Sequence, residues 1–134
     1  MPDRVEDSLQ RARQALETAR VDHETAGDRR AALNRLYYAC FHAARAVLYN
    51  RGYDTSKHRR VLSLVDRELV HEGNLPREQS QTFRDLFVAR QDADYGFGQV
   101  NEDVERLMSQ AEEFVETMEA LLDDLELEDA TNDA

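Results

Sequence analysis

The chain has 134 residues, of which 41% are hydrophobic, and its formal net charge at pH 7 is −11. This length is typical of one domain, and the hydrophobic content is sufficient for a single core. Cys40 is the only cysteine, which excludes an internal disulfide and a cysteine-based zinc site. The apolar segments are too short to span a bilayer, and the first ten residues are polar, unlike a secretory signal. We therefore expect a soluble, cytoplasmic protein with no membrane partner.

The charge is distributed unevenly along the chain. Residues 102–134 contain thirteen acidic residues and one basic residue, a net charge of −12. Residues 29–91 contain twelve basic and six acidic residues, a net charge of +6, so the middle of the chain is able to face an anion. Lys57 is the only lysine. An acidic, lysine-poor composition fits a halophilic protein, but a GC-rich genome gives the same arginine bias, and both explanations remain open.

Apolar residues recur at helical spacing, and glycine and proline are few, which predicts an all-α fold. We expect five helices, at residues 3–26, 29–51, 57–72, 76–95 and 102–128. Their N-caps are expected to come from Asp28, from residues 54–56 and from Asn101. Short links make consecutive helices antiparallel, so the sequence predicts an up-and-down helical bundle of four to five helices. The bundle is expected to form one domain over residues 1–128, with a frayed acidic tail at 129–134.

The second predicted helix has two different faces. Its apolar face is expected to lie in the core and comprises Leu33, Leu36, Tyr37, Cys40, Phe41, Ala44, Val47 and Leu48. The stripe almost opposite comprises Arg35, Tyr38, His42, Arg45 and Tyr49. Such side chains are able to stack on a base and bind a phosphate, but they are also enriched at dimer interfaces. Both interpretations hold if a ligand site lies at a dimer seam.

The segment TSKHRR (55–60) is the densest group of basic residues in the chain. It lies at a predicted helix start, where cations oppose the helix dipole unless an anion joins them. One interpretation is a phosphate site formed by Lys57, His58 and Arg60. The other is a solvated loop that pairs with the acidic last helix.

The segment RQDADYG (90–96) places Asp92 and Asp94 in the last turn of a predicted helix, where carboxylates oppose the dipole. Arg90 and Asp94 are four residues apart and are able to form a helical ion pair. That pair does not account for Asp92 or Tyr95, so we interpret the segment as part of a site. The four histidines lack the spacing of a metal site on one helix, and we predict neither a metal nor a cofactor.

Three motifs in this order, RLYYACFHAARAVLYNRG, SKH and RQDADYG, resemble an uncharacterised prokaryotic branch of the HEPN (higher eukaryotes and prokaryotes nucleotide-binding) domain family. The resemblance covers about residues 8–125. It implies a helical bundle that commonly dimerises and is often encoded beside a minimal nucleotidyltransferase, as toxin and antitoxin. Many members are RNases that use an arginine followed, after four to six residues, by a histidine. Arg90 matches this arginine, but positions 94 to 97 are Asp, Tyr, Gly and Phe.

Because this histidine is missing, we expect a protein without an intact RNase motif. We expect it to be a component of a toxin–antitoxin-type system, paired with a minimal nucleotidyltransferase. It is expected to form a homodimer and to bind a nucleotide, RNA or a partner protein. The expected ligand-binding residues are Arg90, Asp94, Tyr95, Tyr38, His42, Arg45, Lys57, His58 and Arg60. One alternative is an active ribonuclease toxin in which Arg90 acts with His42 or Tyr95. Another is a purely structural dimerisation module.

Overall fold

The computed structural model describes residues 2–25, 27–95 and 103–132, with side chains described at 4–25, 27–91 and 103–123. Within these ranges the chain is helical and contains no strand, which confirms the predicted all-α fold. The helices are α1 (Pro2–Glu24), α2 (Arg29–Asn50), α3 (His58–Leu64), α4 (Arg77–Tyr95) and α5 (Val104–Asn132), and a π-helical segment, η1 (Val65–Val70), continues α3. None of the described helices is long and apolar enough to cross a membrane.

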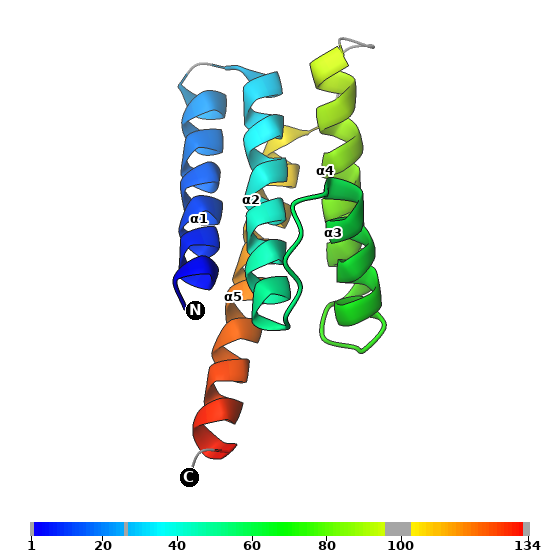
Figure 1. Ribbon diagram of the computed structural model, residues 1–134. Helices are drawn as coiled ribbons and strands as arrows, with labels where there is room; N and C mark the ends of the chain where they lie inside the picture. The colour runs from blue at the N-terminus through cyan, green and yellow to red at the C-terminus, as the bar shows by residue number, and fades with distance from the viewer. Residues whose placement is uncertain (1, 26, 96–102, 133–134) are drawn as a thin grey trace.

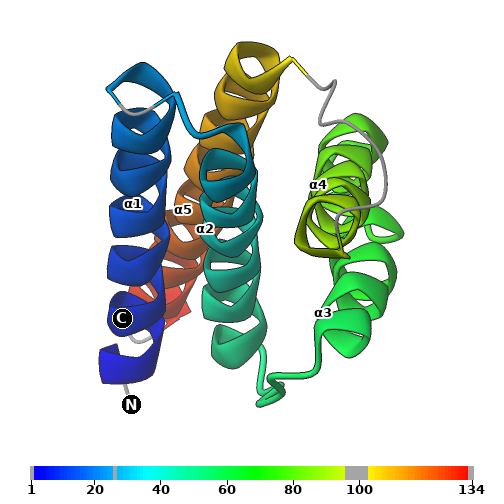
Figure 2. The ribbon, with the colours of Figure 1, turned by 90° about the horizontal axis from the view of Figure 1, so that it is seen from above.

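Helix α2 lies at the centre of the bundle. It contacts α1 along most of its length, and it also packs against α3, α4 and α5. Figure 1 shows α1 and α2 side by side, α5 behind them, and α3 and α4 on the other side of α2. The view from above shows the same order (Figure 2). The C-terminal part of α5 extends beyond the other helices (Figure 1).

The core is built mainly on α2. All eight residues of its predicted apolar face are buried, as expected. Four alanines outside that face are also fully buried, Ala32, Ala39, Ala43 and Ala46. Their small side chains leave room for neighbouring helices to approach α2 closely, which explains why this helix has no solvent-exposed apolar face.

The ends of the helices depend on local turn chemistry. Gly27 has φ 64°, a left-handed conformation that glycine adopts without strain, and Asp28 then caps α2 through a hydrogen bond from the Ala31 amide (3.1 Å). The Asp28 cap is thus confirmed. The predicted Asn101 cap lies outside the described residues, and α5 is capped by Asp103, whose Oδ1 accepts from the Arg106 amide (3.1 Å).

The third predicted helix differs from the prediction at both ends. Its N-cap is Lys57, without a side-chain cap, because the Thr55 hydroxyl accepts from the Lys57 amide (3.2 Å) and so stabilises the preceding turn instead. The prediction that residues 54–56 cap this helix was therefore wrong. The α-helical part ends at Leu64 and continues as η1, where the His71 amide donates to the Asp66 carbonyl (2.9 Å), five residues back.

Candidate functional site

Arg90 of α4 reaches across to two consecutive tyrosines of α2. Its guanidinium carbon lies 5.2 Å from the ring centroid of Tyr37 and 5.1 Å from that of Tyr38. Both distances are within the range of a cation–π interaction. The arginine of RQDADYG therefore lies against the tyrosines of RLYYACFHAARAVLYNRG, although the two motifs are far apart in the sequence.

His58, the first residue of α3, also contacts Tyr37. Its ring stacks on Phe41, with centroids 4.4 Å apart, and its Nδ1 lies 2.5 Å from the Tyr37 hydroxyl oxygen. Burial raises the pKa of Tyr37, so the hydroxyl keeps its proton. Burial, together with the charges of Arg90 and Arg45, lowers the pKa of His58. A neutral imidazole carries its hydrogen on one of its two nitrogens, so the Tyr37 hydroxyl either donates to Nδ1 or accepts from it.

Arg45 and His42 extend this arrangement along α2. The Arg45 guanidinium carbon lies 5.5 Å from the Phe41 ring centroid and 5.0 Å from that of Tyr49, whose hydroxyl accepts a hydrogen bond from Arg45. His42 flanks Tyr38, with ring centroids 5.9 Å apart. Burial, and then the charges of Arg45 and Arg11, lower the pKa of His42 to about 4, so this imidazole is neutral at pH 7.

We call this set of side chains the Arg90 cluster. It comprises Tyr37, Tyr38, Phe41, His42, Arg45, His58 and Arg90. Two guanidinium groups and two neutral imidazoles lie among aromatic rings, and none of the seven residues is acidic. Guanidinium groups bind phosphates, and aromatic rings stack on bases, so the cluster is suited to a ligand with both groups. Among the described residues, no group of three or more His, Cys, Asp or Glu side chains is placed to hold a metal ion.

The structure brings together five of the residues predicted to bind a ligand, namely Tyr38, His42, Arg45, His58 and Arg90. Lys57 and Arg60 are exposed and lie outside the cluster. Asp94 and Tyr95 belong to the last turn of α4, but their side chains lie outside the described residues.

Tyr37 and Phe41 were assigned to the core and not to a site. Both are indeed buried, but Tyr37 also supports Arg90 and hydrogen-bonds His58, and Phe41 stacks on His58. A signal was available in the sequence, because a tyrosine on an apolar face needs a partner for its hydroxyl.

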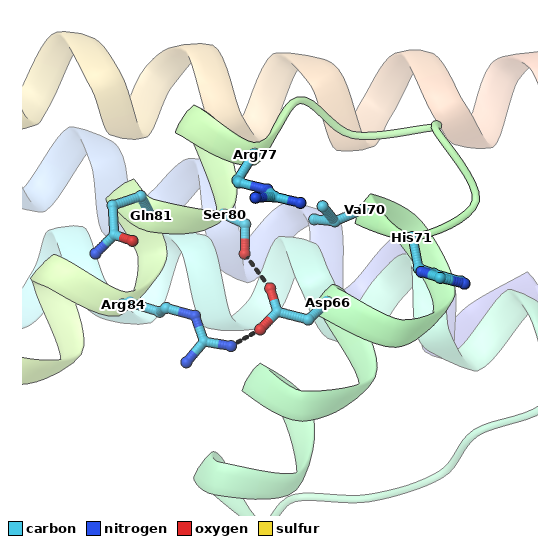
Figure 3. A pocket seen from close by; sticks show the side chains of 7 residues that line it. All are labelled: Asp66, Val70, His71, Arg77, Ser80, Gln81 and Arg84. Carbon is cyan, nitrogen blue, oxygen red and sulfur yellow. Dashed lines mark hydrogen bonds and ion pairs between the residues drawn. The ribbon is translucent and has the colours of Figure 1, made fainter.

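A separate pocket of about 500 Å³ lies between η1 and α4 (Figure 3). At its floor, Asp66 accepts a hydrogen bond from the Ser80 hydroxyl (2.5 Å) and forms an ion pair with Arg84. Figure 3 shows both side chains directed at the Asp66 carboxylate. Because these polar groups satisfy one another, we interpret this contact as a structural link between η1 and α4.

The sequence is similar to those of several known proteins. The profile of the HEPN domain family matches residues 5–121. A UPF0332 protein of Thermotoga maritima is 35% identical over 96 residues, which cover 70% of this chain and 73% of the relative. A UPF0332 protein of Archaeoglobus fulgidus is 29% identical over 116 residues, covering 85% of this chain and 91% of the relative.

A third relative, from Methanocaldococcus jannaschii, has the name "Putative toxin MJ0605" and is 29% identical over 97 residues, covering 72% of each chain. The family match covers most of the chain, so this all-α protein belongs to the HEPN domain family. Within that family it is similar to the UPF0332 proteins, in agreement with the resemblance to an uncharacterised branch.

Proposed function

We propose that this protein binds a nucleotide or RNA at the Arg90 cluster and that it does so without an intact RNase motif. The observation that carries the proposal is the position of Arg90, which lies against the half-buried Tyr38 and against Tyr37, the hydrogen-bond partner of His58. A guanidinium held in this way is preorganised for a phosphate, since its orientation does not have to be fixed on binding. The ring of Tyr38 offers a surface on which a base is able to stack.

We further propose that the protein is one component of a toxin–antitoxin-type pair, with a minimal nucleotidyltransferase as its partner, and that it forms a homodimer. The family membership supports this proposal, as does the name of the Methanocaldococcus relative. The stripe of tyrosines and arginines on α2 provides a surface on which a second copy is able to pack.

A ribonuclease is the second candidate function, and one contact favours it. The cluster contains two histidines, His42 and His58, although this chain lacks the histidine that follows the arginine in the family motif. Arg90 and His58 both contact Tyr37, and the charges of Arg90 and Arg45 contribute to the lowered pKa of His58. When Nδ1 of the neutral His58 carries the hydrogen and donates to Tyr37, its Nε2 is free to accept a proton from a 2′-hydroxyl. His58 is therefore a candidate base beside His42, which contacts Tyr38.

The proposed binding is tested by titrating 5′-AMP and a fluorescein-labelled RNA dinucleotide with the wild-type protein and two arginine variants. Arg90→Ala should weaken binding at least about tenfold, equivalent to ~1.4 kcal/mol, because charge-assisted hydrogen bonds to phosphate are lost. Arg77→Ala is the matched control, since Arg77 is an exposed arginine of the same helix outside the cluster. Thermal melts of both variants verify folding. Equal binding by the wild type and Arg90→Ala would contradict the proposal.

An RNA-cleavage assay separates the two candidate functions. We expect no cleavage by the wild type. Cleavage that is abolished by His58→Ala and retained by His42→Ala would instead show that the protein is an enzyme. Absence of both ligand binding and cleavage would leave the structural dimerisation module as the better description.

A further inference from the structure

A groove runs along the seam between α1 and α2, next to the Arg90 cluster. It consists of two pockets of about 410 and about 310 Å³, and Arg11 and His42 line both of them. Four arginines line the groove, Arg4 and Arg11 from α1 and Arg35 and Arg45 from α2. The groove therefore adds three arginines, Arg4, Arg11 and Arg35, to Arg45 of the Arg90 cluster.

The arginines of the groove are only partly neutralised. Arg4 pairs with Asp54 (2.6 Å) and Arg11 with Asp7 (3.1 Å), and both pairs are largely exposed to solvent. Arg35 and Arg45 have no carboxylate ion-pair partner among the described residues. Because the groove lining includes four arginines and two aspartates, it keeps an excess of positive charge even with His42 neutral.

Two buried nitrogen atoms of residues that line the groove have no hydrogen-bond partner among the described residues. His42 Nδ1 and Arg45 Nε are buried, and no described group forms a hydrogen bond with either of them. Buried polar atoms in proteins are nearly always hydrogen-bonded, to protein, water or a ligand. Because these two atoms are buried, a ligand in the groove would contact the accessible parts of the two side chains, and the case for a site rests on the arginines and tyrosines.

The aromatic lining points to the chemical class of this ligand. Tyr38 lines one pocket and Tyr49 the other, and Tyr38 also belongs to the Arg90 cluster. The α2 positions from Arg35 to Tyr49 span about 21 Å at ~1.5 Å per residue. That distance corresponds to about six nucleotides at ~3.4 Å per nucleotide of a stacked strand. Tyrosines between arginines suit a single strand, whose bases are free to stack on side chains.

We infer that the groove between α1 and α2 binds the sugar–phosphate backbone of a single-stranded nucleic acid that continues from the Arg90 cluster. This inference rests on the proposed function, because the cluster provides the adjoining site. An acidic protein segment, such as α5 of a second copy, is the competing occupant. It explains the cations but not the tyrosines, and two glutamates of α5 already pair with Arg13 and Arg20 of α1.

The experiment measures the binding of labelled oligouridylates of two and eight nucleotides to the wild type, to Arg90→Ala and to two double variants. For the wild type we expect much tighter binding of the octamer. Arg11→Ala/Arg35→Ala should lose about tenfold or more of the octamer affinity. The double variant should also reduce the magnitude of the slope of the log binding constant against log salt concentration by about 1.4, because each of two lost phosphate contacts on a single strand contributes ~0.7. Its binding of the dinucleotide should be unchanged. The matched control is Arg13→Ala/Arg20→Ala, which removes the same charge from the side of α1 that faces α5 and should retain octamer affinity within about twofold.

The outcomes distinguish this inference from the proposed function. If octamer binding is weakened by Arg90→Ala but not by Arg11→Ala/Arg35→Ala, the proposed binding in the groove is contradicted and the proposed Arg90 site is retained. Equal affinity of the wild type for the dinucleotide and the octamer would also contradict the proposed binding in the groove. If neither oligonucleotide binds the wild type, both proposals fail. Binding of a peptide of residues 104–123, with no octamer binding, would identify the groove as a protein interface.

Discussion

Tyr37 determines the chemistry of the side chains around it. Its ring supports the Arg90 guanidinium, and its hydroxyl is hydrogen-bonded to His58, so one buried residue orients two charged or titratable groups. The hydroxyl is also the reason that a polar residue is tolerated at a fully buried position, since its hydrogen bond is satisfied inside the protein.

Replacing Tyr37 by phenylalanine should lower the free energy of unfolding by about 1–2 kcal/mol, because the change leaves His58 Nδ1 without its hydrogen-bond partner. The control is Tyr38→Phe, since no hydrogen bond of the Tyr38 hydroxyl is found among the described residues. It should change stability by less than about 0.5 kcal/mol. Urea titrations of both variants measure the difference. Equal effects at the two adjacent positions would show that the Tyr37–His58 contact contributes nothing to stability.

His42 should make the stability dependent on pH. Its pKa is lowered from 6.5 to about 4 in the folded protein, so the unfolded chain binds a proton between these values and the folded protein does not. The stabilisation is therefore complete above about pH 6.5 and is progressively lost as the pH falls towards 4. After allowing for solvent screening of a partly exposed ring, we expect a loss of about 1–2 kcal/mol.

The measurement is the unfolding free energy at pH 7 and pH 4.5 for three proteins. His42→Gln should reduce the loss on acidification. His71→Gln should leave it unchanged, because His71 is exposed. An identical pH dependence for the wild type and His42→Gln would contradict the lowered pKa of His42.

At the level of the elements, η1 positions the start of α3. The Glu68 carbonyl accepts from Arg51 (2.9 Å), and the Glu68 carboxylate accepts from the Tyr53 hydroxyl (2.8 Å), so η1 holds the loop that leads to His58. On its other side, η1 is linked to α4 through Asp66 and Ser80. The six-residue π-helical segment therefore couples α2, α3 and α4, the three helices that form the Arg90 cluster.

A double-mutant cycle with Asp66→Ala and Ser80→Ala should reveal this link. We expect each single change to cost about 1 kcal/mol and the two to be coupled by about 0.5–1.5 kcal/mol, because Ser80 is buried against the carboxylate. The hydrogen bond between Gln81 and Asp85, also on α4, is the control. That pair is exposed, so its coupling should stay below about 0.5 kcal/mol. Purely additive effects of Asp66→Ala and Ser80→Ala would exclude the link.

At the scale of the whole molecule, acidic and basic side chains are concentrated on different sides of the bundle. The acidic α5 lies behind α1 and α2 in Figure 1, whereas the Arg90 cluster involves α2, α3 and α4. Ion pairs from Arg13 to Glu119 and from Arg20 to Glu112 join α1 to α5, but they neutralise only a small part of the −12 charge of residues 102–134. This separation leaves the aromatic and basic side available for an anion.

The excess of carboxylates predicts that salt stabilises the protein. Repulsion along α5 is screened as ionic strength rises, and the few exposed ion pairs lose little, so the melting temperature should rise by about 2–8 °C between dilute buffer and 1 M salt. Glu116→Gln, which removes one exposed acidic charge from α5, should raise the melting temperature in dilute buffer and reduce the salt effect. A melting temperature independent of salt would remove the halophilic explanation of the composition.

The proposed homodimer gives a separate whole-molecule prediction. Light scattering at micromolar concentration in high salt should give about twice the 15.5 kDa mass of one chain. Tyr49→Ala should shift the equilibrium towards the monomer if the stripe on α2 forms the interface. Gln81→Ala, a change at an exposed position of α4 away from the stripe, should not. A monomeric wild type under these conditions would contradict the dimer.

Much of the fold could be predicted because helical periodicity and turn chemistry act over short distances. The apolar face of α2 is buried as predicted, Asp28 caps that helix, and the motif arginine lies where α4 meets α2. The π-helical turn of η1 could not be predicted. It coincides with contacts from Asp66 to α4, and those contacts exist only when the two elements pack together.

The sequence by itself determined which residues share a face of each helix, since the angle between neighbouring residues is the same in every α-helix. Only the tertiary structure decided which faces meet. It placed both His58 and Arg90 against Tyr37 and left Lys57 and Arg60 exposed, although all four basic residues belong to the motifs that indicated a site. The rotation and approach of helices distant in sequence depend on packing around the whole core, and no local pattern contains that information.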